Sequence, residues 1–197
     1  MNGIDTIFKA AEKLFAEKSF SSVSMDQIAQ KSGMSKGNLY HHFESKEDLY
    51  NQLLFNCHQR ISDLLKETES IEGTYLDKIR FFVKEHLKIL MADPQKTKLL
   101  LKEFSDLIDR NSMYDKRTFF LTNFEMVVNL IDQAKKNNEI TRTCDSKLLA
   151  IQFLSPTFSY LVFQSVAKEM LGDSDPYKNI HLTDQMTENL INGLINK

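Results

Sequence analysis

The sequence predicts an all-α protein. Its 197 residues include only six Gly and three Pro, so few residues favour the turns that hairpins and short strands require. Leu, Lys, Glu, Gln and Met, which favour helix, are abundant. Apolar residues also recur three and four positions apart, which is the spacing of one helical face. In the first segment that face consists of Ile4, Ile7, Phe8, Ala11, Leu14 and Phe15. We expect about nine helices.

The first helix is expected at about residues 3–18, and the polar stretch SFSSVS follows it. Two short helices, at about 25–31 and 36–42, are separated by SGMS, and a longer helix runs from Lys46 to about Thr68. The segment ESIEGTY predicts a linker. Beyond it we expect helices at about 74–92, 95–110, 113–137, 145–171 and 182–196.

The breaks between the later helices have local causes. Asp93-Pro94 separates two of them, because Pro disfavours helix in the residue before it. The polar segments KKNNEITRT and LGDSDPYKN separate the others. Pro156 lies inside the expected helix 145–171, where it removes one backbone hydrogen bond. We therefore predict a bend or break between Gln152 and Pro156.

Three helix caps follow one another between residues 24 and 48. Ser24 begins the pattern S-x-x-Q, which is typical of a capping box, and Gly33 can end that helix in the left-handed conformation. Ser35 and Ser45 are placed to cap the next two helices. Three caps so close together predict three helices joined by tight turns. This is the helix-turn-helix geometry, in which the second helix enters the major groove of DNA.

The short helix 36–42 carries polar groups suited to DNA. Leu39 and Phe43 are its expected core residues, and Gly37 costs about 1 kcal/mol relative to Ala without a structural gain, whereas it permits close approach to a DNA backbone. Lys36 and Asn38 are suited to base edges. Phosphate oxygens are the expected targets of Ser24, Ser35, Tyr40, His41 and Lys46. A helix corner with a purely structural role is the alternative.

The overall charge of the chain does not by itself indicate a nucleic-acid partner. The formal net charge is −2. Between residues 24 and 46, Lys31, Lys36 and Lys46 stand against Asp26 and Glu44, which leaves a local balance of +1. Affinity for DNA would then come from helix N-termini and from two copies of the site, and not from a broad basic field.

Residues 4–50 resemble the N-terminal domain of the TetR family of transcriptional regulators. The resemblance lies in AA-x-x-LF of the first helix and in IA…SGMSKGNLYHHFESKEDLY, and it is strongest to the multidrug-binding repressors of the family. The family usually has Gly in the turn where this chain has Ser19, so we expect a slightly strained turn there.

The resemblance implies a helix-turn-helix DNA-binding domain at residues 1–48 and a helical ligand-binding and dimerisation domain at 49–197. The last two long helices would pair in a homodimer. This dimer would bind a palindromic operator in double-stranded DNA, act as a repressor, and be released by a small apolar or aromatic effector. The candidate ligand-binding residues are aromatic, although most Phe side chains in such a domain belong to the core: Phe82, Phe104, Phe120, Phe124 and Phe158.

Three carboxylates in the C-terminal part, Glu103, Asp106 and Glu125, are candidate polar groups of that site, but we expect them to face solvent. Cys57 and His58 fall where the multidrug-binding repressors carry acidic residues, which puts a specificity for cationic drugs in doubt.

Other classes of protein find less support in the sequence. The two cysteines, Cys57 and Cys144, form no C-x-x-C pair, so we expect no metal site, no disulfide and no cofactor. No apolar run reaches the roughly 18 residues of a membrane span, and we expect a cytoplasmic protein without a membrane partner. The motifs G-x-S-x-G, H-E-x-x-H and G-x-G-x-x-G are absent, so an enzyme is not expected. A helical scaffold or lipid-binding protein without DNA activity is the remaining alternative.

Overall fold

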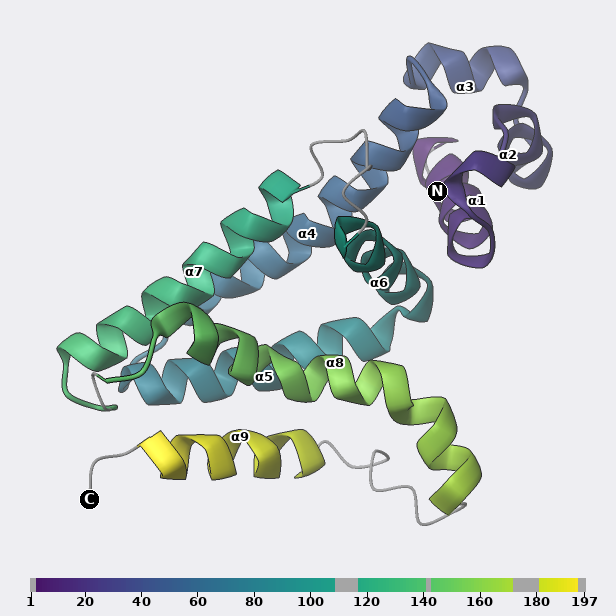
Figure 1. Ribbon diagram of the computed structural model, residues 1–197. Coiled ribbons are helices and arrows are strands. Elements are labelled where there is room, and N and C mark those ends of the chain that lie inside the picture. The colour runs from purple at the N-terminus through teal and green to yellow at the C-terminus, as the bar shows by residue number, and fades with distance from the viewer. Residues whose placement is uncertain (1–2, 109–116, 141–142, 172–180, 195–197) are drawn as a thin grey trace. The chain divides into compact units, whose positions relative to one another are not determined.

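The structure is a computed structural model that describes residues 3–108, 117–140, 143–171 and 181–194. Within these residues all regular structure is helical, which confirms the predicted fold class (Figure 1). The helices are α1 (Gly3–Glu17), the short 3₁₀ helix η1 (Phe20–Ser22), α2 (Met25–Ser32), α3 (Lys36–His42), α4 (Lys46–Ser70), α5 (Tyr75–Ala92), α6 (Pro94–Ile108), α7 (Arg117–Lys136), α8 (Ser146–Leu171) and α9 (His181–Leu194). Each α-helix corresponds to an expected element, whereas η1 lies in the polar stretch SFSSVS, where no helix was expected. The expected ends at 109–116 and 195–196 lie outside the described residues.

The chain forms two compact units. The first comprises Met1–Arg60 with Leu90–Phe120, and the second comprises Ile61–Ile89 with Leu121–Lys197. Helix α4 begins in the first unit and ends in the second. This division follows packing, and the functional boundary at residue 48 stays a prediction.

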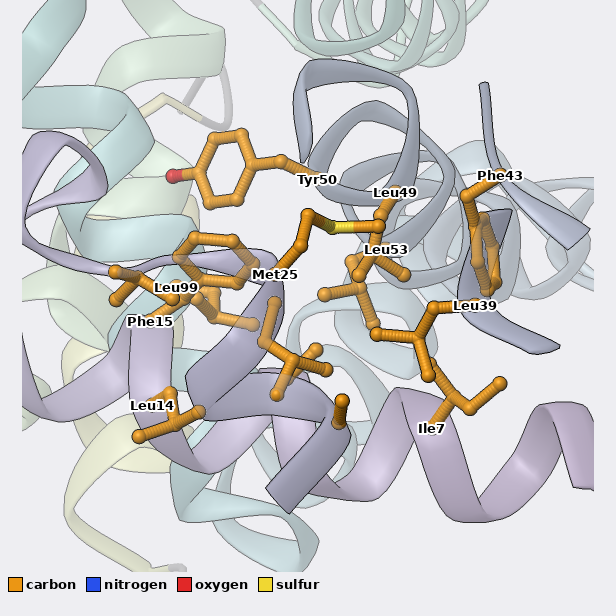
Figure 2. Packing of buried hydrophobic residues seen from close by; sticks show 14 of the residues in the cluster. Ile7, Leu14, Phe15, Met25, Leu39, Phe43, Leu49, Tyr50, Leu53 and Leu99 are labelled. Atoms are coloured by element: carbon orange, nitrogen blue, oxygen red, sulfur yellow. The ribbon is translucent and has the colours of Figure 1, made fainter. Parts of the chain in front are cut away.

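An apolar cluster holds the helices of the first unit together (Figure 2). Buried residues of α1, α2, α3 and the start of α4 meet there, and aromatic rings add to the packing. The Phe15 ring meets Tyr50 edge-on at 4.8 Å and stacks on Phe20 at 5.8 Å between centroids. Leu39 and Phe43, the expected core residues of α3, are both buried in this cluster. Helix α3 is therefore held by one face in this cluster, and it packs against α2.

Helix α6 belongs to the same core although it lies far along the chain. Leu99 is fully buried among the residues of the cluster. Three residues later, Lys102 Nζ donates hydrogen bonds to Phe15 O at 2.8 Å and Lys18 O at 3.0 Å, at the C-terminal end of α1. A cation at this end also complements the helix dipole. Helix α6 thus completes the core of the first unit, although no feature of the local sequence predicts that it packs there.

The turn after α1 is unstrained, so the expectation based on Ser19 is wrong. Ser19 has φ −64° and ψ 152°, an extended conformation open to every residue. The chain forms η1 there instead of a left-handed turn. Serine hydroxyls support it, because Ser19 Oγ donates to Ser22 Oγ and Ser22 Oγ donates to Ser19 O, each at 2.9 Å.

The second unit contains α8, α9, the greater parts of α5 and α7, and the last part of α4, residues 61–70. Its core includes Ile131, Ala134, Leu149, Phe153 and Ile191. Two polar contacts lock α5: Leu76 N–H donates to Glu139 Oε2 at 2.8 Å, and Arg80 Nε donates to Glu188 Oε1 of α9 at 2.6 Å.

Helix α8 continues through Pro156, so the predicted break does not occur. The missing N–H of Pro156 costs the hydrogen bond to Gln152 O. Nearby, Ser155 Oγ donates to Ile151 O at 2.7 Å. Figure 1 shows the axis of α8 changing direction along its length.

Candidate nucleic-acid interface

The predicted caps of the helix-turn-helix are present. Ser24 Oγ accepts from Gln27 N–H at 3.2 Å, and Ser24 N–H donates to Gln27 Oε1 at 3.0 Å, which completes the capping box. Gly33 has φ 68° and ψ 17°, the left-handed conformation that ends α2. Ser35 Oγ and Ser45 Oγ each accept a backbone N–H at 3.1 Å, from Asn38 and Asp48. The corner between α2 and α3 is therefore set by residues close together in sequence.

The face of α3 opposite its buried residues is open. Lys36, Gly37, Tyr40 and His41 are exposed, and Asn38 is half-buried beside them. Tyr40 retains 49% of its accessible surface, although large aromatic side chains are usually more buried. Helix α3 thus presents donors on one side while its other side anchors it.

The side chains of Lys36 and Asn38, the predicted base-reading residues, make only weak interactions with the rest of the described protein. Lys36 Nζ lies 2.8 Å from Asp26 Oδ1 of α2, and this hydrogen-bonded pair raises the pKa of the lysine. Both partners are more than half exposed, so water screens their attraction. Within the described parts of the chain, Asn38 Nδ2 donates to Met34 Sδ alone, at 3.5 Å, and sulfur is a weak acceptor. Both side chains could exchange these partners for a base edge at small cost.

Gly37 has no packing reason to be Gly. A Cβ at this position would meet nothing closer than Ser35 Oγ at 4.0 Å, so an alanine would fit the free protein. The absence of a side chain leaves the backbone of α3 open to close approach from outside.

Lys46 is placed differently from the other predicted contacts. Its Nζ donates to Phe20 O at 3.0 Å and Val23 O at 2.9 Å, and it lies 4.3 Å from the centroid of the Phe20 ring. Lys46 therefore ties the start of α4 to η1. Two of its three N–H donors are used, and one remains for a phosphate.

The five predicted ligand-binding phenylalanines fall in both units. Phe104 and Phe120 lie in the first unit, and the Phe104 side chain is outside the described residues. In the second unit, Phe82 is buried and stacks on His86 at 5.3 Å, while Phe124 and Phe158 are half-buried. Burial lowers the pKa of His86 to about 4.

Glu103 does not face solvent as expected. It is 2% exposed, and its Oε2 lies 2.7 Å from His58 Nε2 of α4. Its position four residues after the buried Leu99, on the same helical face, is the signal that could have revealed this. Glu125 is exposed, as expected, and pairs with Lys147 at 3.1 Å. Asp106 lies outside the residues whose side chains are described.

No helix in the described part of the chain is long and apolar enough to cross a membrane.

The segment that contains the helix-turn-helix matches a known protein family. Residues 7–53 match the family described as bacterial regulatory proteins, tetR family. The biofilm operon negative transcriptional regulator IcaR of Staphylococcus epidermidis is 32% identical over 75 residues, which are 36% of this chain and 40% of that protein. A regulator of the same name from Staphylococcus aureus is 28% identical over 42% of this chain and 45% of its own length. The matches thus span less than half the length of these relatives.

Solved structures show the same fold over nearly the whole chain. The fatty acid degradation regulator FadR of Bacillus halodurans covers 100% of this chain and 98% of its own, with a TM-score of 0.76 and 19% identity. FadR of Bacillus subtilis in complex with stearoyl-CoA covers 96% and 98%, with a TM-score of 0.70 and 18% identity. A special closeness to multidrug-binding repressors stays a prediction. Residues 7–53 therefore form a domain of the kind described as bacterial regulatory proteins, tetR family.

Proposed function

We propose that this protein is a transcriptional regulator, most simply a repressor, that binds a palindromic operator as a homodimer in the cytoplasm. The observation that carries the proposal is the construction of α3. Leu39 and Phe43 anchor the helix, while Lys36, Tyr40 and His41 point away from that core and are exposed. A scaffold or lipid-binding protein gains nothing from this arrangement, and the relatives with similar N-terminal sequences are named as negative regulators.

The direct contacts that we propose divide into two kinds. Lys36 and Asn38 read base edges, and Gly37 lets the backbone of α3 approach the groove. Ser24, Ser35, Tyr40 and His41 contact phosphates, which fix the register of the protein on DNA. Lys46 holds η1 in place and offers its third donor to a phosphate.

The test is a gel shift with the DNA flanking the protein's own gene. We expect a discrete complex that survives excess unrelated duplex of equal length and composition, at a stated salt concentration. Equal competition by the flanking and the unrelated DNA would contradict the proposal, and would favour the scaffold or lipid-binding alternative. The relatives matched are regulators, and we propose no enzymatic activity.

The proposed dimer contact lies on α8. Large apolar side chains are exposed along this helix, with Val162 at 60% and Met170 at 78% of their accessible surfaces. The others that are about half exposed are Leu148, Ile151, Phe163 and Val166. A run of this kind marks an interaction site, and a two-fold interface uses the same patch on both subunits. Leu161 of α8 and Ile191 of α9 are buried within the protomer, so they lie outside this exposed run.

Light scattering at micromolar concentration is expected to give twice the chain mass of 22.9 kDa. Val162→Glu, which places a charge at the centre of the run, should shift the mass toward the monomer. Glu169, an exposed residue of the same helix, provides the matched control as Glu169→Gln, which should leave the dimer intact. A monomer in the wild type would contradict the dimer.

We propose a small-molecule effector, with the predicted phenylalanines as its candidate contacts. FadR of Bacillus subtilis, which shares the fold, has been crystallised with stearoyl-CoA. Helix α4 runs without interruption from Lys46, next to the helix-turn-helix, to Ser70. We propose that effector binding shifts α4 near Leu54–His58 and so changes the spacing of the two α3 helices. Such a shift requires that the effector bind the two arrangements with different affinity.

A further inference from the structure

Met34 lies in the turn between α2 and α3 and contacts a residue that we propose reads DNA bases. Its N–H donates to Ala29 O at 3.1 Å, which fixes the backbone at the end of α2. Its Sδ accepts a hydrogen bond from Asn38 Nδ2 at 3.5 Å, and its side chain is half-buried. The sulfur of Met34 is therefore the atom that the Asn38 amide would leave when it turns to a base edge.

The methyl end of the Met34 side chain is held on the other side. The side chain packs against the apolar cluster of the first unit. A Cβ built on Gly3, at the start of α1, would lie 3.5 Å from Met34 Cε, which is ordinary van der Waals contact. The backbone of Met34 is fixed by α2 and its methyl group lies against α1, so the sulfur between them stays beside the Asn38 amide.

Oxidation of this sulfur would turn a weak acceptor into a strong one. A hydroperoxide transfers one oxygen atom to the thioether, so that an S–O bond forms and the O–O bond breaks. The sulfur is oxidised by two electrons, the peroxide is reduced to water or an alcohol, and the side chain neither gains nor loses a proton. The product, methionine sulfoxide, is polar and carries an oxygen that accepts hydrogen bonds. This oxygen would compete with a base edge for the N–H groups of Asn38.

We infer that Met34 is a redox-sensitive modification site, whose sulfoxide lowers operator affinity by holding the Asn38 amide away from DNA. The oxidant is a hydroperoxide, and methionine sulfoxide reductases remove the added oxygen, so the change is reversible. This inference rests on the proposed function, since it names a regulation of the same DNA-reading face.

Other sulfur atoms in the described chain provide internal controls. Met25 is only 6% exposed, in the core of the first unit. Met91 of α5 and Met170 of α8 are 38% and 78% exposed, and lie on helices outside the helix-turn-helix. Burial raises the pKa of Cys57 to about 12, so the thiolate that reacts with peroxide is scarce there.

The test compares a labelled operator with a scrambled duplex, by fluorescence anisotropy, before and after treatment of the protein with hydrogen peroxide. Peptide mass spectrometry measures oxygen addition at each methionine, and complete oxidation of Met170 sets the dose. A dithiol, added once the peroxide is removed, reverses thiol oxidation and leaves sulfoxides in place. Operator affinity should fall about 5-fold to 150-fold, as one strengthened hydrogen bond in each subunit predicts, with the scrambled duplex unaffected. Methionine sulfoxide reductases should restore it.

Three variants, each compared with its own untreated sample, locate the effect. Met34→Leu keeps the volume and apolar character of the side chain and removes the sulfur, so its operator affinity should survive peroxide. Met91→Leu is the matched control, and should lose affinity as the wild type does. Asn38→Ala has no amide to hold, so oxidation should cause no further loss. A purely structural effect of the sulfoxide predicts instead that Asn38→Ala still loses affinity and that both duplexes weaken alike.

Three results would each overturn the inference: no oxygen addition at Met34 when Met170 is fully oxidised, an unchanged operator affinity after Met34 is oxidised, or an equal loss in Met34→Leu. The untreated wild type decides the proposed function separately. If it binds both duplexes alike, the proposed function fails and this inference fails with it. If it prefers the operator and oxidation changes nothing, the inference alone fails.

Discussion

Phe43→Ala is expected to lower the free energy of unfolding by about 3–5 kcal/mol, the usual cost of emptying a buried phenylalanine site. Phe43 is 2% exposed and meets Phe8 edge-on at 5.4 Å. Its N–H also closes α3 by donating to Leu39 O at 2.9 Å. The alanine would keep this backbone contact and lose the packing that seats α3. Urea unfolding, followed by circular dichroism, measures the loss.

Tyr40→Ala is the matched control, because it removes an aromatic ring from the same helix on the exposed side. We expect it to change stability by no more than about 0.5 kcal/mol, as is usual for surface positions. It should nevertheless weaken binding to every duplex. If Phe43→Ala cost no more than Tyr40→Ala, the core that holds α3 would have to lie elsewhere.

Lys36→Ala and Asn38→Ala should each reduce operator affinity strongly and leave unrelated DNA nearly unaffected. A good bidentate contact discriminates by about 1–3 kcal/mol at one base pair, and a symmetric dimer makes each contact twice. The expected loss for either variant is therefore about 30-fold to 10⁴-fold. Fluorescence anisotropy with a labelled operator and a scrambled duplex, at one salt concentration, measures both affinities.

Two further substitutions show whether the loss concerns sequence reading. Tyr40→Phe removes a phosphate contact and should weaken both duplexes alike. Asp26→Asn releases Lys36 from its ion pair and removes a negative charge close to the proposed groove, so both duplexes should bind more tightly. Operator binding by Lys36→Ala and Asn38→Ala at wild-type strength would show that α3 is not the recognition helix.

The helix-turn-helix could be predicted from the sequence because its determinants are local. The caps at Ser24, Ser35 and Ser45 each bind a group three residues away, and Gly33 ends α2 through its own backbone. The strain expected at Ser19 is absent because this residue has an extended backbone conformation that needs no glycine. The chain reaches α2 through a 3₁₀ turn, which has no such requirement.

Contacts between distant parts of the chain escaped prediction. Lys46 finds its acceptors at Phe20 and Val23, and Glu103 finds His58 across 45 positions of sequence. The expectation that Glu103 faces solvent rests on its polarity alone, although its position four residues after Leu99 puts it on the buried face of the helix. The doubt about cationic ligands, which rests on Cys57 and His58, stays a prediction.

The place of α6 in the first core bears on how this regulator could be re-engineered. A fragment ending at Arg60 would lack Leu99, which fills the apolar cluster, and Lys102, which covers the carbonyl end of α1. The first unit is thus built from two stretches of chain, so the helix-turn-helix is not expected to be stable when it is cut out and grafted alone. A hybrid that joins these recognition residues to a foreign sensor domain would need either α6 itself or a foreign helix whose side chains fill the same gap.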